Sequence, residues 1–227
     1  MKRVIVIACS LCLAVAGDIT AAGQQTSRPT SSLSSPKGAS EPVDNRGFIH
    51  RWLVLEPIPV PGRLTESAVQ DALKSAAIPD AGGALPKDGE AVTANGLDVH
   101  WHALDTSNYN LNLYHFAWSL SKPTSNVLFW IVTTVDSPRD IPNVRLAIGS
   151  NAASRWWLNG DPVIAINDDR QTVIDDGVSP RVTLHRGRNV IRAAVINGGG
   201  ATDFCARFLD EKDQPLAGLS VSLEPAP

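Results

Sequence analysis

A long series of short apolar segments, separated by turn residues, is the feature that most constrains the fold of this chain. Val, Ile, Leu and aromatic residues dominate the segments, and Gly, Pro, Asn, Asp and Ser fill the intervals between them. Strands this frequent, mostly without helices between them, predict an all-β fold, an antiparallel sandwich or barrel. The predicted strands are residues 52–55, 97–104, 110–118, 126–135, 143–149, 154–160, 162–166, 180–184, 189–196, 204–210 and 219–223.

One short helix is predicted ahead of most of these strands, within residues 65–78. Apolar residues recur there near helical spacing, and Ser67 with Gln70 has the pattern of a capping box. Residues 79–96 are rich in Gly, Pro and Asp and are predicted to form a loop.

The segment SRWWLNG sets two tryptophans side by side. On a strand, alternation sends Trp156 and Trp157 to opposite faces, so only one of them can belong to the core. We place Trp156 in the core and Trp157, with its neighbour Arg155, on the other face. The following Asn159-Gly160 pair predicts a two-residue hairpin turn.

The N-terminus has the layout of a secretory signal peptide. Two basic residues precede an apolar run to Ala16, and small residues continue to Ala22. We therefore expect residues 1–22 to be removed and the mature protein to be secreted or periplasmic. The run is too short to span a membrane. Lipoprotein anchoring through Cys9 is less favoured, because only the short run VIVIA precedes that cysteine.

Residues 23–45 and 46–227 differ sharply in composition. The first segment is rich in Ser, Pro, Thr and Gln, cannot bury enough apolar surface to offset the entropy of ordering, and is predicted to be a disordered tether. The second is long enough to form one β-sandwich domain with its own core. Without the signal peptide, Cys205 is the sole cysteine, so no intramolecular disulfide supports this domain, and we expect Cys205 to be a buried small hydrophobe.

Charge and sequence motifs exclude several classes of partner. The formal net charge is −3 with the signs interspersed, which argues against a nucleic-acid partner or an anionic membrane surface. The sequence has no G-x-S-x-G nucleophile elbow, zinc-protease helix, phosphate loop or dinucleotide fingerprint. Ser150 follows a glycine at a strand end, but nothing in the sequence places a catalytic base beside it.

From residue 126 onward, the order of strands and turns resembles that of galactose-binding-like jelly-roll domains. These domains are accessory parts of bacterial carbohydrate-active enzymes, among them acetyl xylan esterase-like proteins and the sugar-binding domain of beta-galactosidase-type enzymes. The opening segment FIHRWLVLEPIPVPG is also similar, with Glu56 where glycine is usual. The matching positions are Trp157, Leu158, Asn159 and Gly160 in one hairpin, and Val182, Leu184, Gly187, Asn189, Ile191, Val195 and Asn197 in a second signature.

The resemblance implies an antiparallel β-sandwich of jelly-roll type with one short N-terminal helix. Its motifs are fold motifs, and none of the matching positions performs a reaction. Domains of this kind often carry a structural calcium, so calcium is the one cofactor that the resemblance suggests. A jelly roll serves sugar binding, protein binding and plain structural roles alike.

Four residues are candidates for contact with a ligand. Trp157 and Arg155 share a strand face, and an indole beside a guanidinium can stack on a sugar ring and hydrogen-bond its hydroxyls. The alternative, which we favour, is that a loop such as 57–62 or 80–96 covers Trp157, which then only packs. Tyr109 and Tyr114 are rival aromatic candidates.

Two polar groups could bind a metal. His100 and His102 lie two apart on a predicted strand, so both imidazoles face one way and Trp101 the other, but the sequence supplies no clear third ligand. We favour a packed Trp101 and two histidines on a polar outer face. The loop 166–179 gathers carboxylates that could hold calcium, although their spacing matches no defined calcium loop and a solvated turn is the simpler interpretation. These carboxylates are Asp168, Asp169, Asp175 and Asp176.

Three functions remain open from the sequence. The first is an exported, non-catalytic carbohydrate-binding module associated with polysaccharide utilisation. The second is a carbohydrate esterase-associated protein, and the third a cell-surface domain that binds a partner protein. The ligand would be a carbohydrate or a protein, without nucleic acid and without membrane insertion.

Overall fold

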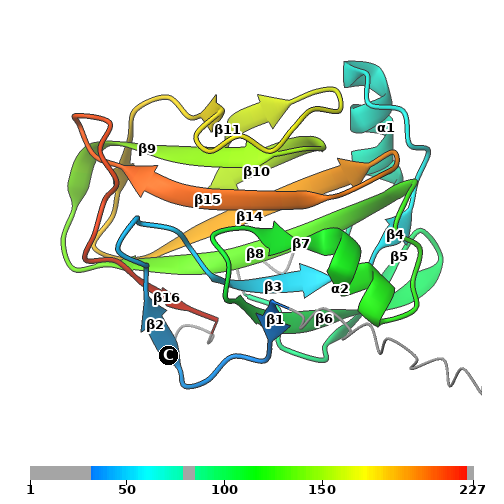
Figure 1. Ribbon diagram of the computed structural model, residues 1–227, viewed down its shortest axis with the longest axis horizontal. Helices are drawn as coiled ribbons and strands as arrows, with labels where there is room; N and C mark the ends of the chain where they lie inside the picture. Colours follow the sequence, from blue (N-terminus) through cyan, green and yellow to red (C-terminus); the bar gives the residue numbers. More distant parts are fainter. Residues whose placement is uncertain (1–31, 79–84, 224–227) are drawn as a thin grey trace, which may run out of the picture. The chain divides into compact units, whose positions relative to one another are not determined.

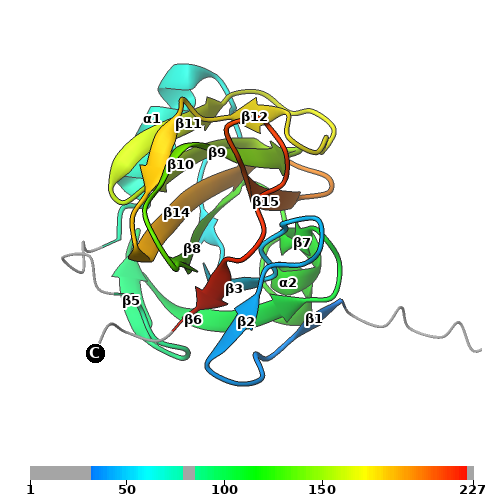
Figure 2. The same ribbon diagram turned by 90° about the vertical axis from the view of Figure 1, so that its left-hand side faces the viewer.

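The computed structural model describes residues 32–78 and 85–223, which form two antiparallel β-sheets and two short helices. Figures 1 and 2 show the smaller sheet lying over the larger one, as expected for a β-sandwich. The predicted signal peptide, residues 1–22, lies outside the described residues. Within the described residues, no helix is long and apolar enough to cross a membrane.

The larger sheet is formed by β1 (Leu33–Ser34), β2 (Ser40–Pro42), β3 (Arg51–Leu55), β4 (Ile58–Pro59), β5 (Ala91–Ala94), β6 (Leu97–Thr106), β8 (Val127–Ser137), β10 (Ala153–Leu158), β11 (Asp161–Ile166), β14 (Gly187–Asn197) and β16 (Ser220–Ser222). Its main path is β1-β6-β3-β8-β14-β10-β11. The smaller sheet is formed by β7 (Leu111–Asn112), β9 (Ile141–Ser150), β12 (Gly177–Val178), β13 (Val182–Leu184) and β15 (Asp203–Leu209).

The main core lies between the two sheets. β8 and β14 pair over their whole lengths in the middle of the larger sheet, and their inward side chains, such as Phe129 and Val195, are fully buried. Trp156 of β10 is also fully buried there, where its ring meets the edges of Trp52 and Phe204 at centroid distances of 6.3 and 5.5 Å. The prediction that Trp156 belongs to the core is confirmed.

A second apolar layer covers the outer face of the larger sheet. Helix α1 (Glu66–Ser75) lies on that face and buries Val69 and Ala72 against outward side chains, among them Trp130 and Ile196. β8 is therefore covered on both faces, which explains why its sequence is a nearly unbroken apolar run rather than an alternating one. Trp101 of β6 is buried in the same layer, as the sequence predicts.

The structure corrects the prediction of a strand over residues 110–118 and of a single helix. After the two residues of β7, the chain forms helix α2 (Leu113–Ser119). The Asn112 side chain caps this helix by accepting a hydrogen bond from the His115 N–H at 2.7 Å. Leu113, Phe116 and Ala117 follow helical spacing and fill the main core.

Two further local predictions are corrected. Within residues 79–96, predicted as loop, β5 pairs with β6 through a hairpin at Asn95 and Gly96, which have φ of 49° and 73°. The predicted capping box of α1 is absent, since the N-cap is Thr65 without a side-chain hydrogen bond. Gln70 instead donates to the Glu66 carboxylate at 3.1 Å.

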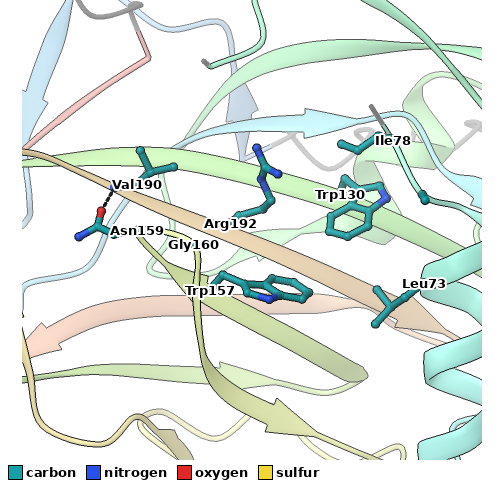
Figure 3. A pocket seen from close by; sticks show the side chains of 9 residues that line it. Leu73, Ile78, Trp130, Trp157, Asn159, Gly160, Val190 and Arg192 are labelled. Carbon is teal, nitrogen blue, oxygen red and sulfur yellow. Dashed lines mark hydrogen bonds between the residues drawn. The ribbon is translucent and has the colours of Figure 1, made fainter. Parts of the chain in front are cut away.

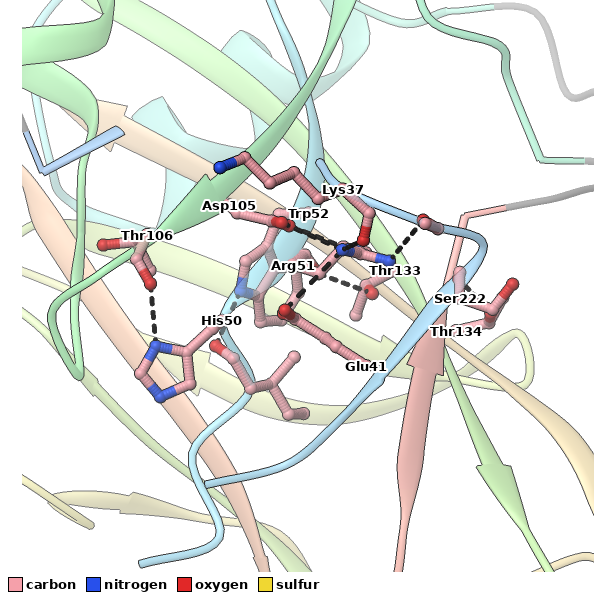
Figure 4. A network of polar contacts seen from close by, with 12 residues as sticks. Lys37, Glu41, His50, Arg51, Trp52, Asp105, Thr106, Thr133, Thr134 and Ser222 are labelled. Carbon is pink, nitrogen blue, oxygen red and sulfur yellow. Dashed lines mark hydrogen bonds and ion pairs between the residues drawn. The ribbon is translucent and has the colours of Figure 1, made fainter. Parts of the chain in front are cut away.

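Part of the predicted tether, residues 32–45, belongs to the domain. β1 pairs with β6, and β2 pairs with β16. The buried Arg51 guanidinium fastens this segment, because it donates to the carbonyl oxygens of Lys37 and Gly38 while Asp105 binds it from β6 at 2.8 and 2.9 Å (Figure 4). Glu41 adds a weaker ion pair at 3.6 Å, and burial raises its pKa. Composition missed this segment because a distant arginine, backbone pairing and only two apolar residues, Leu33 and Val43, hold it on the domain.

Candidate functional site

A groove lies on the outer face of the larger sheet, between that face and the end of α1 (Figure 3). Trp130 of β8 and Trp157 of β10 project into it from the sheet, with ring centroids 5.9 Å apart and planes inclined by 35°. Leu73 and Ile78 line the helix side. The groove has a volume of about 610 Å³, within the usual range for small-molecule sites.

The pairing of three strands brings the sheet side of the groove together. Arg192 of β14 lies opposite Trp157 in the register with β10, and Ala194 lies opposite Trp130 in the register with β8. Arg192 and Val190 therefore line the groove beside the two indoles. Because β8, β14 and β10 pair side by side, their hydrogen bonds fix the spacing of the side chains on the floor of the groove.

The hairpin after Trp157 holds one end of the groove in place. Asn159 and Gly160 have φ of 53° and 92°, which confirms the predicted two-residue turn. The Asn159 side chain accepts from the Val190 N–H at 2.8 Å and donates to the Asn189 side chain at 3.1 Å. Asn189, fully buried, in turn spans the tight turn that begins β14 by bonding both backbone groups of His185. These asparagines therefore fix the turns.

Trp157 is half-buried and packs against the outer apolar layer. Of the described residues, helix α1 supplies its neighbour Leu73. The sequence suggested loops 57–62 or 80–96 as the cover, and residues 80–84 of the second loop lie outside the described residues. The indole of Trp130 is fixed as well, since its Nε1–H donates to the Ala76 carbonyl at 2.8 Å. Trp157 is thus neither fully covered nor an isolated surface platform.

Arg155 is buried and fully engaged. Its guanidinium donates to the carbonyl oxygens of Ser154 and Ile166 and, at 2.7 Å each, to the side chains of Glu66 and Asn167. Hydrogen bonds from Gln70 and Asn167, together with Arg155, lower the pKa of Glu66. Arg155 therefore anchors α1 on the sheet, and the structure offers no guanidinium edge of it for stacking beside Trp157.

A second hollow of about 390 Å³ lies on the other side of Trp157, where α1 faces β11. Its walls include Leu73 and Trp157, which it shares with the first hollow, and the polar residues Glu66, Gln70 and Arg155. Glu66 and Arg155 neutralise each other, so this part of the site carries paired charge.

The two candidate tyrosines lie away from the groove. Tyr109 packs on Phe48 with centroids 5.5 Å apart, and the Arg46 guanidinium lies 5.6 Å from its ring centroid. Tyr114 is on α2, beside His115. Both are partly exposed, but neither lines the hollows around Trp157.

His100 and His102 face the same way, as predicted, but the prediction that they lie on a polar outer face is wrong. Trp101 lies in the outer apolar layer, and His102 contacts Phe116 of the main core with ring centroids 5.4 Å apart. Both histidines approach the carboxylate of Glu56. Glu56 lies 3.4 Å from His102 Nε2, 3.9 Å from His100 Nδ1 and 3.0 Å from Lys122 Nζ. Burial raises the pKa of Glu56, but hydrogen bonds from Lys122 and His102 outweigh that effect and the net pKa is lowered. Among residues 32–78 and 85–223, no group of three or more His, Cys, Asp or Glu residues is arranged to hold a metal ion.

The four candidate calcium ligands do not converge. Asp175 forms a two-pronged ion pair with Arg207, and Asp176 pairs with Arg170 at 2.7 Å. Asp168 and Asp169 are exposed. A structural calcium remains a prediction of the sequence, and arginines already engage two of its candidate ligands.

Ser150 and Cys205 are both buried in the smaller sheet. The Ser150 hydroxyl donates to the Ala152 carbonyl at 3.0 Å, which makes it a turn residue rather than an exposed nucleophile. Burial raises the pKa of the Cys205 thiol to about 11, so the thiol is protonated at neutral pH and inert. The prediction of a buried Cys205 is confirmed.

Sequence reasoning missed Trp130, Leu73 and Arg192 as neighbours of Trp157. Trp130 lies within an unbroken apolar run, where periodicity does not show which residues face outward. Leu73 was assigned to the helix, but no sequence signal says which sheet face a helix covers. The register of β8, β14 and β10 brings Trp130 and Arg192 beside Trp157, and the docking of α1 adds Leu73.

No protein-family model and no curated protein sequence matches the chain. Among solved structures, the chain is similar to the PA14 sugar-binding domain from an RTX adhesin, with 11% identity and a TM-score of 0.44 over 78% of this chain and 100% of that chain. It is also similar to the PA14 domain of the MpAFP antifreeze protein, with 12% identity and a TM-score of 0.41 over 81% and 90% of the two chains.

A beta-glucosidase from Kluyveromyces marxianus, solved with glucose, matches 70% of this chain and 17% of its own, with 13% identity and a TM-score of 0.40. All three likenesses are too distant to carry an argument about the ligand. The candidate site therefore rests on its own geometry.

Proposed function

We propose that this domain is a carbohydrate-binding module whose ligand packs on Trp157 in the groove beside Trp130. The observation that carries the proposal is a half-buried indole on β10, packed in the outer apolar layer beside α1, that lines a groove of about 610 Å³. Flat apolar surface next to a few polar groups suits a sugar, which has an apolar ring face and hydroxyls around its edge.

The groove combines these two kinds of surface. Trp130, Trp157, Leu73 and Val190 supply apolar area, and Arg192 and Asn159 are polar residues of the lining. The floor is preorganised, because the indole of Trp130 and the Asn159-Gly160 turn are already fixed by hydrogen bonds. Binding therefore requires little ordering of the protein, which favours affinity.

Export and a role in polysaccharide utilisation are part of the same proposal. The layout of residues 1–22 supports export, and intact-mass measurement of the exported protein tests it. A mature chain that begins near residue 17 or 23 is expected, whereas retention of Met1–Ala16 contradicts export.

The binding proposal is tested by isothermal titration with xylo-, cello- and manno-oligosaccharides. Trp157→Ala should abolish measurable binding while the protein remains folded, because the variant removes the stacking surface. Trp118→Ala is the matched control, since this tryptophan is 54% exposed on α2 and lines neither hollow. A folded Trp157→Ala protein with the parent's affinity, or a parent that binds no sugar, contradicts the proposal.

The esterase hypothesis is tested in parallel by an acetyl-ester hydrolysis assay. Ser150, the one serine that the sequence singled out, is fully buried and lacks the exposure of a nucleophile. The alternative of a cell-surface domain that binds a partner protein stays a prediction, and no feature of the described surface favours it over the groove.

A further inference from the structure

Of the hollows that border α1, one bordered by Asp71 does not include Trp157 in its lining, but two others meet at Trp157. Leu73 and Trp157 line both, so the indole has a hollow on either side rather than a groove on one side and packed protein on the other. The two volumes, about 610 and 390 Å³, each fall within the range of sites for small molecules. The space around Trp157 is therefore larger than one compact ligand needs.

One face of α1 borders both hollows. Glu66, Gln70 and Leu73 follow the four- and three-residue steps of a helix face, and all three line the second hollow. At 1.5 Å of rise per residue, Glu66 and Leu73 are separated by about 10 Å along the helix axis. Ala77 and Ile78 then continue the wall of the first hollow beyond the end of α1.

The hollows differ in chemistry. The first is bordered mainly by apolar side chains and two indoles, whereas the second has the carboxylate of Glu66 and the amide of Gln70 at its rim. The Glu66 side chain is 59% exposed and is paired at 2.7 Å with the buried Arg155, so this rim offers hydrogen-bonding groups with balanced charge. Balanced charge suits neutral hydroxyls better than an acidic or basic group.

We infer that the ligand is a neutral oligosaccharide of at least two sugar units, which passes over Trp157 from the first hollow into the second. One unit stacks in the apolar hollow, and the next reaches the Glu66–Gln70 rim. This inference rests on the proposed function and specifies its substrate class. A monosaccharide would fill only one side of the indole.

The test is a titration of the full-length protein with xylose and glucose and with xylo- and cello-oligosaccharides of two to four units. Affinity should rise by about tenfold or more from one unit to three, since a second contact surface is gained. Gln70→Ala should lower the affinity for the trimer several-fold and leave binding of the monosaccharide unchanged. Asp71→Ala is the matched control, because this exposed residue lies on the same helix but lines neither hollow.

The outcomes separate the two proposals. If the monosaccharide and the trimer bind equally, or if Gln70→Ala binds the trimer as the parent does, the inference is wrong while the proposed function stands. If no sugar of any length binds, the proposed function fails and the inference with it.

Discussion

Trp156 and Trp157 are adjacent in the chain but lie in two different environments. Trp156 points between the sheets, is fully buried and contacts other aromatic rings edge-on. Trp157 points outward, is half-buried, and has a hollow on each side under a single helix. The inner face is closed by a second sheet, whereas α1 and the other described segments of the outer layer cover only part of the outer face.

This difference assigns separate roles to the two faces. A filled core between sheets stabilises the fold and leaves no room for a ligand. Among the described residues, the outer layer is formed by the ten-residue helix α1 together with Ile58, Val60 and Leu85, and it leaves hollows beside α1 where a ligand can enter. We therefore attribute stability mainly to the inner face and binding to the outer face.

The largest expected effect is that of Trp156→Ala. Removal of this fully buried ring leaves a cavity between the sheets and should lower the free energy of unfolding by about 3–5 kcal/mol. Urea denaturation followed by circular dichroism measures it. A change near zero would mean that the assignment of the two faces is reversed.

Trp157→Ala should have a smaller effect on stability, about 2 kcal/mol, because part of its ring already faces open space. The same denaturation experiment gives this value, and the ratio of the two losses measures the contrast between the faces directly. Equal losses for the two variants would contradict it.

Arg155→Ala should lower the free energy of unfolding by about 1–2 kcal/mol. The substitution removes the hydrogen bonds that hold α1 on the sheet, although water from the second hollow can reach the vacated acceptors. A limited-proteolysis assay should show earlier cleavage near α1 than in the parent. If α1 keeps its protection, the anchoring role of Arg155 is wrong.

Glu66→Gln should have the smallest effect on stability, because an ion pair with one exposed partner contributes little. The thermal midpoint should stay close to that of the parent. A large drop in the thermal midpoint would show that the ion pair between Arg155 and Glu66, rather than the hydrogen bonds of Arg155 to backbone carbonyls, holds α1 on the sheet.

The sequence predicted the sandwich, most strands and the two faces of β10 because these follow from period-2 patterns and turn residues. It missed β5 although Asn95-Gly96 is the same turn signal as Asn159-Gly160, since the surrounding Gly- and Asp-rich composition suggested a loop. α2 was predicted as a strand because Leu111 and Leu113 alternate, and the cap at Asn112 outweighs that pattern. Composition alone also placed residues 32–45 outside the domain, although Arg51 and β16 hold them within it.

The candidate site was only partly predictable, for a physical reason. Strand alternation places Trp157 on the outer face of the sheet. What lies over it depends on where α1 docks, and the sequence pattern of a helix does not specify which part of a sheet the helix covers. The partners of Arg155 show the same limit. Its position beside Trp157 suggested a role in stacking on a ligand. Its contacts with Glu66, which is distant in sequence, and with Asn167, which lies across a hairpin, instead make it the residue that holds α1 on the sheet.

Hydrogen exchange with and without a bound xylo- or cello-trimer tests most directly the claim that the outer face binds and the inner face stabilises. We predict added protection in peptides that contain α1 and the Trp157–Gly160 hairpin, with β15 and α2 unchanged. Protection confined to α2, or to the smaller sheet, would place the ligand elsewhere and contradict the account.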